Sequence, residues 1–338
     1  MKALVYLGPE RMEIQSVPDP APRQGEVLVG VSAAGVCGSD LHGFLGHSAR
    51  RKPGLVMGHE AVATVLEVPS GVSGWRKGQR VSFNPLVSCG QCRACLDGRQ
   101  NLCPTWWLFG MDRVQGTYAE RVAVPVAQLT GLSDGLTEEE AVLAEPMAVV
   151  VHAFRVGLAG TPRALAIVGG GAIGCLSLIL AKLRGVPKVC VIDVNDARLE
   201  AAKKMGADLA IHAKREDAKA IVHEWSGGGA DAVVEAVGTE GTRRMAVAVA
   251  AKGARLVMLG LAENDSPLPW IDMTRNEQAL FTSFAYAPRD FLDSIELLES
   301  RRVDIRAFTE TRPLEDGQAG FLKMVRDPGA TLKLLLKP

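Results

Sequence analysis

The densest group of chemically capable side chains is a run of four cysteines, Cys89, Cys92, Cys95 and Cys103. Their spacing, C-x2-C-x2-C-x7-C, lets one turning loop bring four thiolates to a single point, which is the ligand set of a closed tetrahedral zinc site. A ferredoxin iron–sulfur run also begins C-x2-C-x2-C and ends in Cys-Pro, but its third spacer is three residues rather than seven. The spacing therefore favours a structural zinc ion.

A second group with metal-binding chemistry lies closer to the amino terminus. Cys37 opens the stretch Cys-Gly-Ser-Asp-Leu-His, and a Gly-His-Glu triplet supplies His59 and Glu60. A thiolate, an imidazole and a carboxylate make an open, Lewis-acidic zinc site when one position is left for water or substrate. Each residue alone has a simpler explanation, because a single cysteine is usually a buried apolar residue and Gly-His-Glu is often an ordinary turn.

The third pattern is a glycine-rich turn, G-x-G-x-x-G, that follows a short apolar run. Its first glycine permits the bend, its second lets a pyrophosphate approach backbone N–H groups, and its third lets the next helix pack closely. A carboxylate about 20 residues further on binds the adenosine ribose and repels a 2′-phosphate. The pattern indicates NAD rather than NADP, although a glycine turn alone can be purely structural. The residues expected at the cofactor are Gly169, Gly171, Ala172, Ile173, Gly174 and Asp193.

Short apolar runs alternate with helical patterns from about residue 163 onward, which is typical of a parallel sheet covered by helices on both faces. The stretch 164–181 is also uncharged and close to the minimum length of a membrane-spanning helix. Its three consecutive glycines argue against that, because each would weaken a helix by about 1 kcal/mol. We therefore expect a doubly wound unit. Its predicted strands are 164–168, 188–193, 231–237 and 255–259, with a helix at 197–205.

The segment before this unit, residues 1–144, has a different character. Val27, Val29 and Val31 alternate with other residues as in a half-buried strand, and glycine and proline breaks are frequent. We expect an irregular β-rich domain whose chemically active residues all lie in loops. A helix and a final apolar strand close the chain, and periodicity does not assign them to either domain. They are predicted at 291–298 and 331–336.

Composition narrows the class of function. Lys+Arg and Asp+Glu both number 38, so the formal net charge is zero. The broad positive field that nucleic-acid or anionic-membrane binding requires is therefore missing, and a small-molecule partner is expected. The first apolar run is too short for a signal peptide, and seven cysteines suit metal binding better than a disulfide framework. We expect a cytoplasmic protein.

Together these motifs resemble the zinc-dependent medium-chain alcohol dehydrogenase family over essentially the whole chain. The resemblance implies an α/β protein whose GroES-like, β-rich catalytic domain is formed by residues 1–146 and 288–338. A Rossmann NAD-binding domain with a doubly wound parallel sheet, residues 147–287, would lie between them. The resemblance also implies two zinc ions per chain and a homodimer or homotetramer.

The resemblance further implies roles for single residues. Cys37 and His59 match ligands of the catalytic zinc, and the four clustered cysteines match those of the structural zinc. Ser39 and His42 fall where the family places a hydroxyl and an imidazole that relay the substrate proton through the cofactor ribose. Further residues expected beside NAD are Arg198, Val237, Leu259 and Leu261.

One departure from the simple alcohol dehydrogenases points to a branch of the family. Where those enzymes carry a third cysteine ligand, this chain reads Ala-Glu-Pro-Met with Glu145, the form found in sorbitol, galactitol-phosphate, threonine and glucose dehydrogenases. Members of this branch differ over which glutamate binds the metal, so Glu60 and Glu145 share that role here, one of them through water. Residues 282–284 lack the Arg-Tyr pair of sorbitol dehydrogenases, so sorbitol itself is not implied.

The sequence is therefore interpreted as an NAD-dependent zinc dehydrogenase that oxidises a secondary hydroxyl of a polyol, a sugar alcohol phosphate or a related compound. Two alternatives stay open: an aldehyde or ketone reductase of the same family, and a non-catalytic NAD-binding zinc protein that senses redox state. The basic run 50–52 is expected to be a solvated loop, with recognition of a substrate phosphate or carboxylate as the alternative. Cys175 and Cys190 match no ligand position and are expected to be packing residues.

Overall fold

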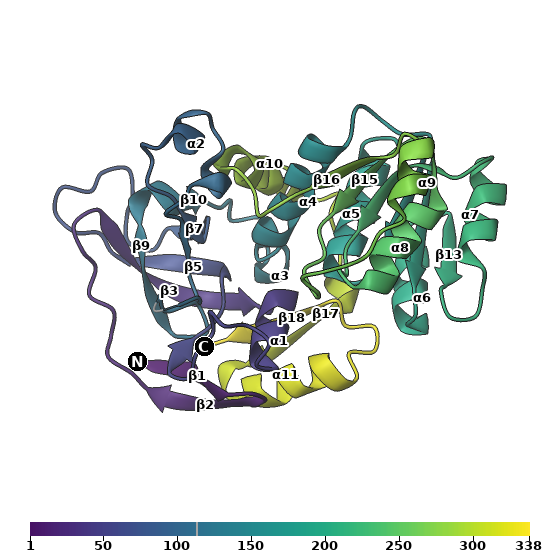
Figure 1. Cartoon of the computed structure of the whole chain (residues 1–338). Helices are drawn as coiled ribbons and strands as arrows, with labels where there is room; N and C mark the ends of the chain where they lie inside the picture. Colours follow the sequence, from purple (N-terminus) through teal and green to yellow (C-terminus); the bar gives the residue numbers. More distant parts are fainter. Residues whose placement is uncertain (113) are drawn as a thin grey trace. The chain divides into compact units, whose positions relative to one another are not determined.

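The computed structural model describes residues 1–112 and 114–338 and divides the chain into two compact units. The first unit contains residues 1–145 and 287–338, and the second contains residues 146–286. In Figure 1 the yellow C-terminal helix α11 (Gly317–Arg326) lies beside the purple N-terminal strands. Both ends of the chain therefore build the first unit.

A seven-stranded sheet forms the centre of the first unit. Its strand β3 (Glu26–Gly35) pairs with β5 (Glu60–Glu67), β9 (Arg121–Pro125) and β18 (Lys333–Lys337). The alternating valines that begin at Val27 point from β3 into the apolar core, as the sequence pattern predicts. The other elements are β1 (Lys2–Gly8), β2 (Arg11–Ser16), α1 (Gly38–Phe44), β4 (Leu55–Val56), β6 (Arg80–Phe83), β7 (Leu86–Val87), α2 (Arg93–Leu96), β8 (Trp107–Leu108), β10 (Leu129–Gly131), α3 (Glu138–Ala141), α10 (Pro288–Glu299) and β17 (Thr309–Pro313).

The second unit contains six parallel strands in the order β13-β12-β11-β14-β15-β16. Numbered along the chain this order is 3-2-1-4-5-6, which is the Rossmann arrangement. All five residues of β11 (Ala164–Val168) are buried, because helices cover both faces of such a sheet. The other elements are α5 (Ala172–Leu183), β12 (Lys188–Asp193), α6 (Asp196–Lys204), β13 (Leu209–His212), α7 (Ala218–Ser226), β14 (Ala230–Glu235), α8 (Glu240–Val249), β15 (Ala250–Met258), α9 (Trp270–Arg275) and β16 (Ala279–Thr282). A further helix, α4 (Ala144–Gly157), begins in the first unit and continues into the second.

Several local structures differ from the sequence predictions. The strand expected at 255–259 is β15, which begins at Ala250. The residues after Cys37 form the helix α1 rather than a loop, and its length of seven residues is too short to show a helical period. The strand expected at 231–237 ends at Glu235, because the carboxylate of Glu235 accepts backbone N–H groups that would otherwise continue the strand. Val237 therefore lies in a loop.

The uncharged stretch 164–181 is divided between strand β11 and helix α5. Across residues 1–112 and 114–338, no helix combines the length and the apolar composition needed to cross a membrane.

Candidate active site

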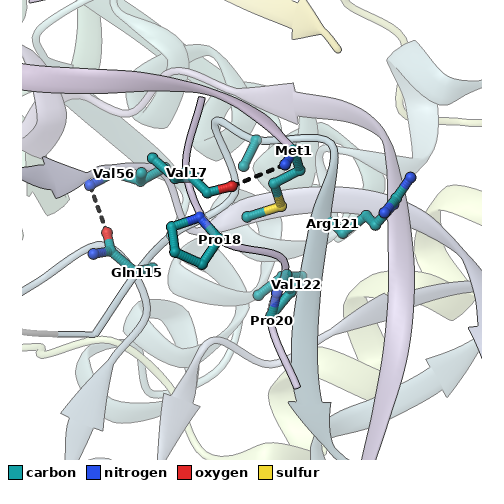
Figure 2. A pocket seen from close by; sticks show the side chains of 10 residues that line it. Met1, Val17, Pro18, Pro20, Val56, Gln115, Arg121 and Val122 are labelled. Carbon is teal, nitrogen blue, oxygen red and sulfur yellow. Dashed lines mark hydrogen bonds between the residues drawn. The ribbon is translucent and has the colours of Figure 1, made fainter. Parts of the chain in front are cut away.

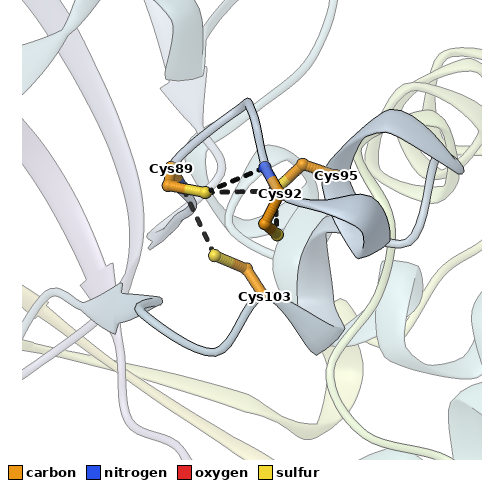
Figure 3. Close-up of side chains that lie close together, drawn as sticks. All are labelled: Cys89, Cys92, Cys95 and Cys103. Carbon is orange, nitrogen blue, oxygen red and sulfur yellow. Dashed lines mark hydrogen bonds between the residues drawn. The ribbon is translucent and has the colours of Figure 1, made fainter.

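Four cysteine thiols converge in the loop between β7 and β8 (Figure 3). None is in a disulfide, and the Sγ atom of Cys95 lies 3.5 Å from that of Cys92 and 3.9 Å from that of Cys89. The sulfur atom of Cys103 belongs to the same group, in which all ligand atoms lie within 4.8 Å of one another. A tetrahedral zinc ion with Zn–S distances of about 2.3 Å would hold its sulfurs about 3.8 Å apart. The four thiols therefore fit a closed zinc shell.

Backbone N–H groups donate hydrogen bonds to two of these thiols and so stabilise their thiolate form. The amide of Cys89 donates to Cys103 Sγ at 3.4 Å and lowers the pKa of that thiol to about 6, and the Thr105 hydroxyl lies 3.5 Å from the same sulfur. The amide of Cys92 donates to Cys89 Sγ at 3.4 Å. Because the thiolate is the metal-binding form of cysteine, these contacts favour metal binding by Cys89 and Cys103. A backbone hydrogen bond from Cys95 lowers the pKa of Cys92, but burial and the neighbouring thiols outweigh it and raise that pKa to about 11.

A second set of possible ligands combines three residue types. The ligand atoms of Cys37, His59 and Glu60 lie within 4.8 Å of one another. Strand pairing explains this convergence, because Gly35 at the end of β3 pairs with Glu60 at the start of β5. Cys37, two residues beyond Gly35, therefore comes close to His59. Thiolate, imidazole and carboxylate are all zinc ligands, and a set with fewer than four of them can leave a position open.

A buried carboxylate, Asp40, organises this set. Its Oδ1 atom lies 3.5 Å from His59 Nδ1 and accepts a hydrogen bond from Arg51 Nη2 at 2.8 Å, while its Oδ2 atom accepts one from the Tyr118 hydroxyl at 2.7 Å. Burial alone would raise the pKa of Asp40, but the charges of His59 and Arg51 hold that pKa well below its ordinary value. Because Asp40 faces Nδ1, the other ring nitrogen of His59 is the one left for a metal.

Two arginines of the basic run 50–52 form ion pairs, whereas a solvated loop was expected. Arg51 is buried and donates to Asp40, and the space for its side chain exists because Gly43 has no Cβ, which would overlap the arginine. Arg50 instead pairs with the carboxylate of Asp112 at 2.7 Å. The prediction of a solvated loop is wrong for Arg51, since the buried charge of Asp40 requires a counter-charge.

The two residues expected to relay a proton lie on one short helix. Cys37 is the N-cap residue of α1, and Ser39 and His42 follow within the helix. The hydroxyl oxygen of Ser39 accepts a hydrogen bond from Arg51 Nη2 at 3.2 Å. The ring of His42 lies 5.1 Å from the ring of the exposed His47, measured between centroids. A helix, and not a loop as predicted, therefore fixes both residues relative to Cys37.

Two further charged residues belong to these surroundings. Lys333 on β18 is buried, and its ammonium group pairs with the carboxylate of Glu60. Burial alone would lower the pKa of Lys333, but the negative charge of Glu60, together with Cys37 and Glu145, raises it. Glu145 is also buried at the start of α4, although the ligand atoms that converge among the described residues include Glu60 and not Glu145.

Sequence reasoning missed three members of this network. Asp40 and Tyr118 carried no signal of their own, because neither belongs to a ligand spacing. Lys333 did carry one, since it is the lone charge in the predicted apolar strand 331–336, where a lysine is rarely buried without a partner.

In the second unit the glycine-rich turn has the geometry expected of a phosphate-binding loop. Gly169 has a φ angle of 104°, in the left-handed region that favours glycine, and a Cβ on Gly174 would overlap the carbonyl oxygen of Gly169. Gly171 is the N-cap residue of α5, with open space where its Cβ would be, and Ala172 and Ile173 begin that helix. The helix N-terminus is therefore accessible to a pyrophosphate.

The carboxylate of Asp193 is fixed against this turn at the end of β12. It accepts backbone hydrogen bonds from Gly170 at 2.6 Å, Val194 at 2.7 Å and Asn195 at 2.9 Å. The guanidinium of Arg198 lies 4.0 Å from it. A carboxylate held in this way keeps its position beside the turn.

The loops that contain Val237, Leu259 and Leu261 are joined by one residue that the sequence reasoning missed. The buried carboxylate of Glu235 accepts from the amides of Val237 at 2.9 Å and Gly238 at 2.8 Å. Its backbone oxygen accepts from Leu259 at 2.8 Å. The sequence did offer a signal for Glu235, which is a charged residue at the end of a buried apolar strand.

Two other features carry no site chemistry. Cys175 and Cys190 are buried, and burial raises the pKa of each thiol to about 12, so they are inert packing residues as expected.

A hollow of about 290 Å³ in the first unit has a mostly apolar lining, which includes Met1 and Val17 (Figure 2). The described residues that line it include no cysteine, histidine or carboxylate.

Comparison with known proteins places these features in one family. Residues 23–134 match the alcohol dehydrogenase GroES-like domain, and residues 172–300 match the zinc-binding dehydrogenase domain. The chain is 33% identical to sorbitol dehydrogenase of Bacillus subtilis strain 168, over 100% of this chain and 97% of that protein.

Solved structures of dehydrogenases are also similar to this chain. Galactitol-1-phosphate dehydrogenase of Escherichia coli superimposes with a TM-score of 0.91 and 26% identity, covering 100% of both chains. An Escherichia coli CFT073 protein described as a short chain alcohol dehydrogenase complexed with NADH superimposes with a TM-score of 0.92 and 28% identity, covering 100% of this chain and 99% of that one.

The chain belongs to the zinc-dependent medium-chain alcohol dehydrogenase family. It is an oxidoreductase, and its cofactors are zinc and NAD. The two alternatives considered from the sequence, a reductase and a non-catalytic redox sensor, are not favoured by these relatives.

Proposed function

We propose that this enzyme oxidises a secondary hydroxyl of a polyol or a sugar alcohol phosphate, with transfer of a hydride from the carbinol carbon to NAD and release of the hydroxyl proton. The observation that carries the proposal is the convergence of Cys37, His59 and Glu60 within 4.8 Å. The relatives named for sorbitol and for galactitol 1-phosphate support a substrate with adjacent hydroxyl groups.

In this proposal Cys37 and His59 hold the catalytic zinc ion, with a carboxylate from Glu60 or Glu145 as the third group. A zinc ion in such an open site supplies Lewis acidity, which lowers the pKa of a hydroxyl group. Asp40 fixes the ring of His59, and the buried charges around it keep that ring in place. The four clustered cysteines would hold a second, structural zinc ion.

The proton of the substrate hydroxyl leaves along helix α1. Ser39 would accept it on the remaining lone pair of its hydroxyl oxygen and give up its own hydrogen, which the hydrogen bond from Arg51 directs away from the guanidinium. His42, three residues further along the same helix, would then deliver the proton towards solvent. General acid–base groups of this kind contribute about 10²- to 10⁴-fold to a rate.

In the second unit, the glycine turn and the N-terminus of α5 would bind the pyrophosphate of NAD, and Asp193 would bind the adenosine ribose. Arg198, Val237, Leu259 and Leu261 would complete the cofactor contacts. A fixed carboxylate at Asp193 repels the 2′-phosphate of NADP. The seven free thiols fit a cytoplasmic location, and the family resemblance supports a homodimer or homotetramer.

A substrate screen tests the proposed reaction directly. NADH formation would be measured with polyols, polyol phosphates, sugars, hydroxy amino acids and simple monohydric alcohols, each at the same concentration. We expect the highest kcat/KM for a compound with vicinal hydroxyls. A preference for monohydric alcohols over every diol would contradict the assignment to the polyol branch.

A single substitution tests the role of Asp193. Asp193→Ser should relax the preference for NAD over NADP by about tenfold or more, which corresponds to about 1.4 kcal/mol for each factor of ten. The ratio of kcat/KM values for the two cofactors measures this. A wild-type enzyme with the higher kcat/KM for NADP would refute the role.

A further inference from the structure

We propose that His47 carries the substrate proton from His42 to solvent, as a second imidazole at the end of the relay along helix α1. This inference rests on the proposed function, because it requires a proton that reaches His42. His47 acts through His42 and not on the substrate itself.

The turn that ends helix α1 brings the two imidazoles together. Leu45 is the C-cap residue of the helix, and Gly46 follows it with a φ angle of 82°, in the left-handed region. The amide of Gly46 donates to the carbonyl oxygen of Gly43 at 2.9 Å, and the amide of His47 donates to that of His42 at 3.1 Å. These two hydrogen bonds define a Schellman turn, which sets the residue two positions after the C-cap against the residue three positions before it.

The side chains that meet across such a turn are frequently apolar, but here both are imidazoles. The ring centroids of His42 and His47 lie 5.1 Å apart, with the ring planes inclined at 65°. Each imidazole has two ring nitrogens that can gain or lose a proton. At this separation a proton can pass between the rings directly or through one bridging water.

The two histidines differ in their access to solvent. His42 is half-buried, whereas His47 is exposed. The backbone fixes where His47 begins, because a Cβ on Gly46 would lie 2.7 Å from Pro9 Cγ and the turn therefore has little room to shift. Since imidazole takes up and releases protons near neutral pH, an exposed histidine beside a half-buried one extends the path of the proton to solvent.

The transfer needs no group beyond those of the proposed reaction. An N–H bond of the protonated His42 ring breaks as an N–H bond forms on the ring of His47, and no electrons are transferred. His47 then gives the proton to water or to a buffer base and can accept the next one. Without His47, a buffer molecule would have to reach the half-buried ring of His42.

Solvent exchange of the His42 ring N–H measures this step without turnover. By NMR of the full chain with isotopically labelled histidine, we expect exchange at low buffer concentration to be about tenfold or more slower in His47→Phe than in wild type. Phenylalanine preserves a ring beside His42 but cannot accept a proton, so this variant separates proton transfer from packing. Added PIPES buffer should restore most of the rate. His223→Gln, which removes an imidazole from helix α7, is the matched control and should exchange as wild type does.

A stopped-flow experiment with a pH-indicator dye follows the same step during the reaction, with the polyol of highest kcat/KM in the substrate screen. In the first turnover of His47→Phe, NADH should form at the wild-type rate, because His42 can still accept one proton. Release of that proton should lag by about tenfold or more at low buffer concentration.

Equal exchange and equal proton release in wild type and His47→Phe would overturn the inference. A loss that added buffer does not restore would also overturn it, because His47 would then only pack against His42. Failure of the proposed function has a different signature, since wild type would then form no NADH from any polyol.

Discussion

The two metal-binding regions of the first unit are built in opposite ways. The cysteine region, Cys89–Cys103, takes all its ligands from one continuous loop, and their outer contacts are backbone N–H groups and a single hydroxyl. The region around Cys37 draws its side chains from separate strands and helices, and buried charges surround it. A closed site can therefore be a local property of the chain. The open one proposed here depends on residues that are distant in the sequence, among them the buried charges of Arg51 and Lys333.

The largest expected effect would come from removing one ligand of the cysteine region. Cys95→Ser should release about one zinc ion per chain and lower the melting temperature by roughly 10 °C or more, because a structural zinc contributes folding free energy directly. Metal analysis and thermal unfolding measure the two quantities. Cys190→Ser is the matched control, since Cys190 is a buried thiol outside the cluster.

Metal analysis and thermal unfolding of Cys37→Ser test whether the two metal-binding regions differ in their contribution to folding. This variant should lose activity and the other zinc ion but keep most of its thermal stability. Equal loss of stability in Cys37→Ser and Cys95→Ser would show that the two regions do not differ in their contribution to folding.

A smaller effect is expected at Glu145. Glu145→Gln should retain the structural zinc and NAD binding but lower kcat/KM for polyols by about 10- to 100-fold if the carboxylate acts through water, and by more if it binds the metal directly. Glu139→Gln, a nearby carboxylate paired with Lys337, is the control. Turnover of polyols by Glu145→Gln at the wild-type rate would remove Glu145 from the site.

The contrast between the regions also explains what the sequence could predict. The cysteine region and the glycine turn were visible because spacing alone brings their residues together. Cys37 and His59 were visible through short motifs, but the register of β3 and β5 that joins them was not. Arg51 was misinterpreted and Lys333 was missed, because a buried charge is recognised by its partner, and each partner lies in a different element.

The outer contacts of the two regions should also differ in strength. Tyr118→Phe removes the hydroxyl that donates to Asp40 at 2.7 Å, and a hydrogen bond to a charged group contributes about 1.5–3 kcal/mol. We expect this loss of stability in urea unfolding, together with faster release of the catalytic zinc to a chelator. Unchanged unfolding would mean that Arg51 and His59 alone suffice for Asp40.

The smallest effect is expected from the corresponding outer contact of the cysteine region. Thr105→Val removes a hydroxyl that lies 3.5 Å from Cys103 Sγ, while the backbone amide of Cys89, which donates to the same sulfur at 3.4 Å, remains. Sulfur is a weak acceptor, and no buried charge is left without a partner. Release of the structural zinc to a chelator should therefore accelerate by about threefold or less. A larger acceleration in Thr105→Val than Tyr118→Phe causes at the catalytic zinc would reverse the comparison, because a side chain and not the loop backbone would then hold the closed site together.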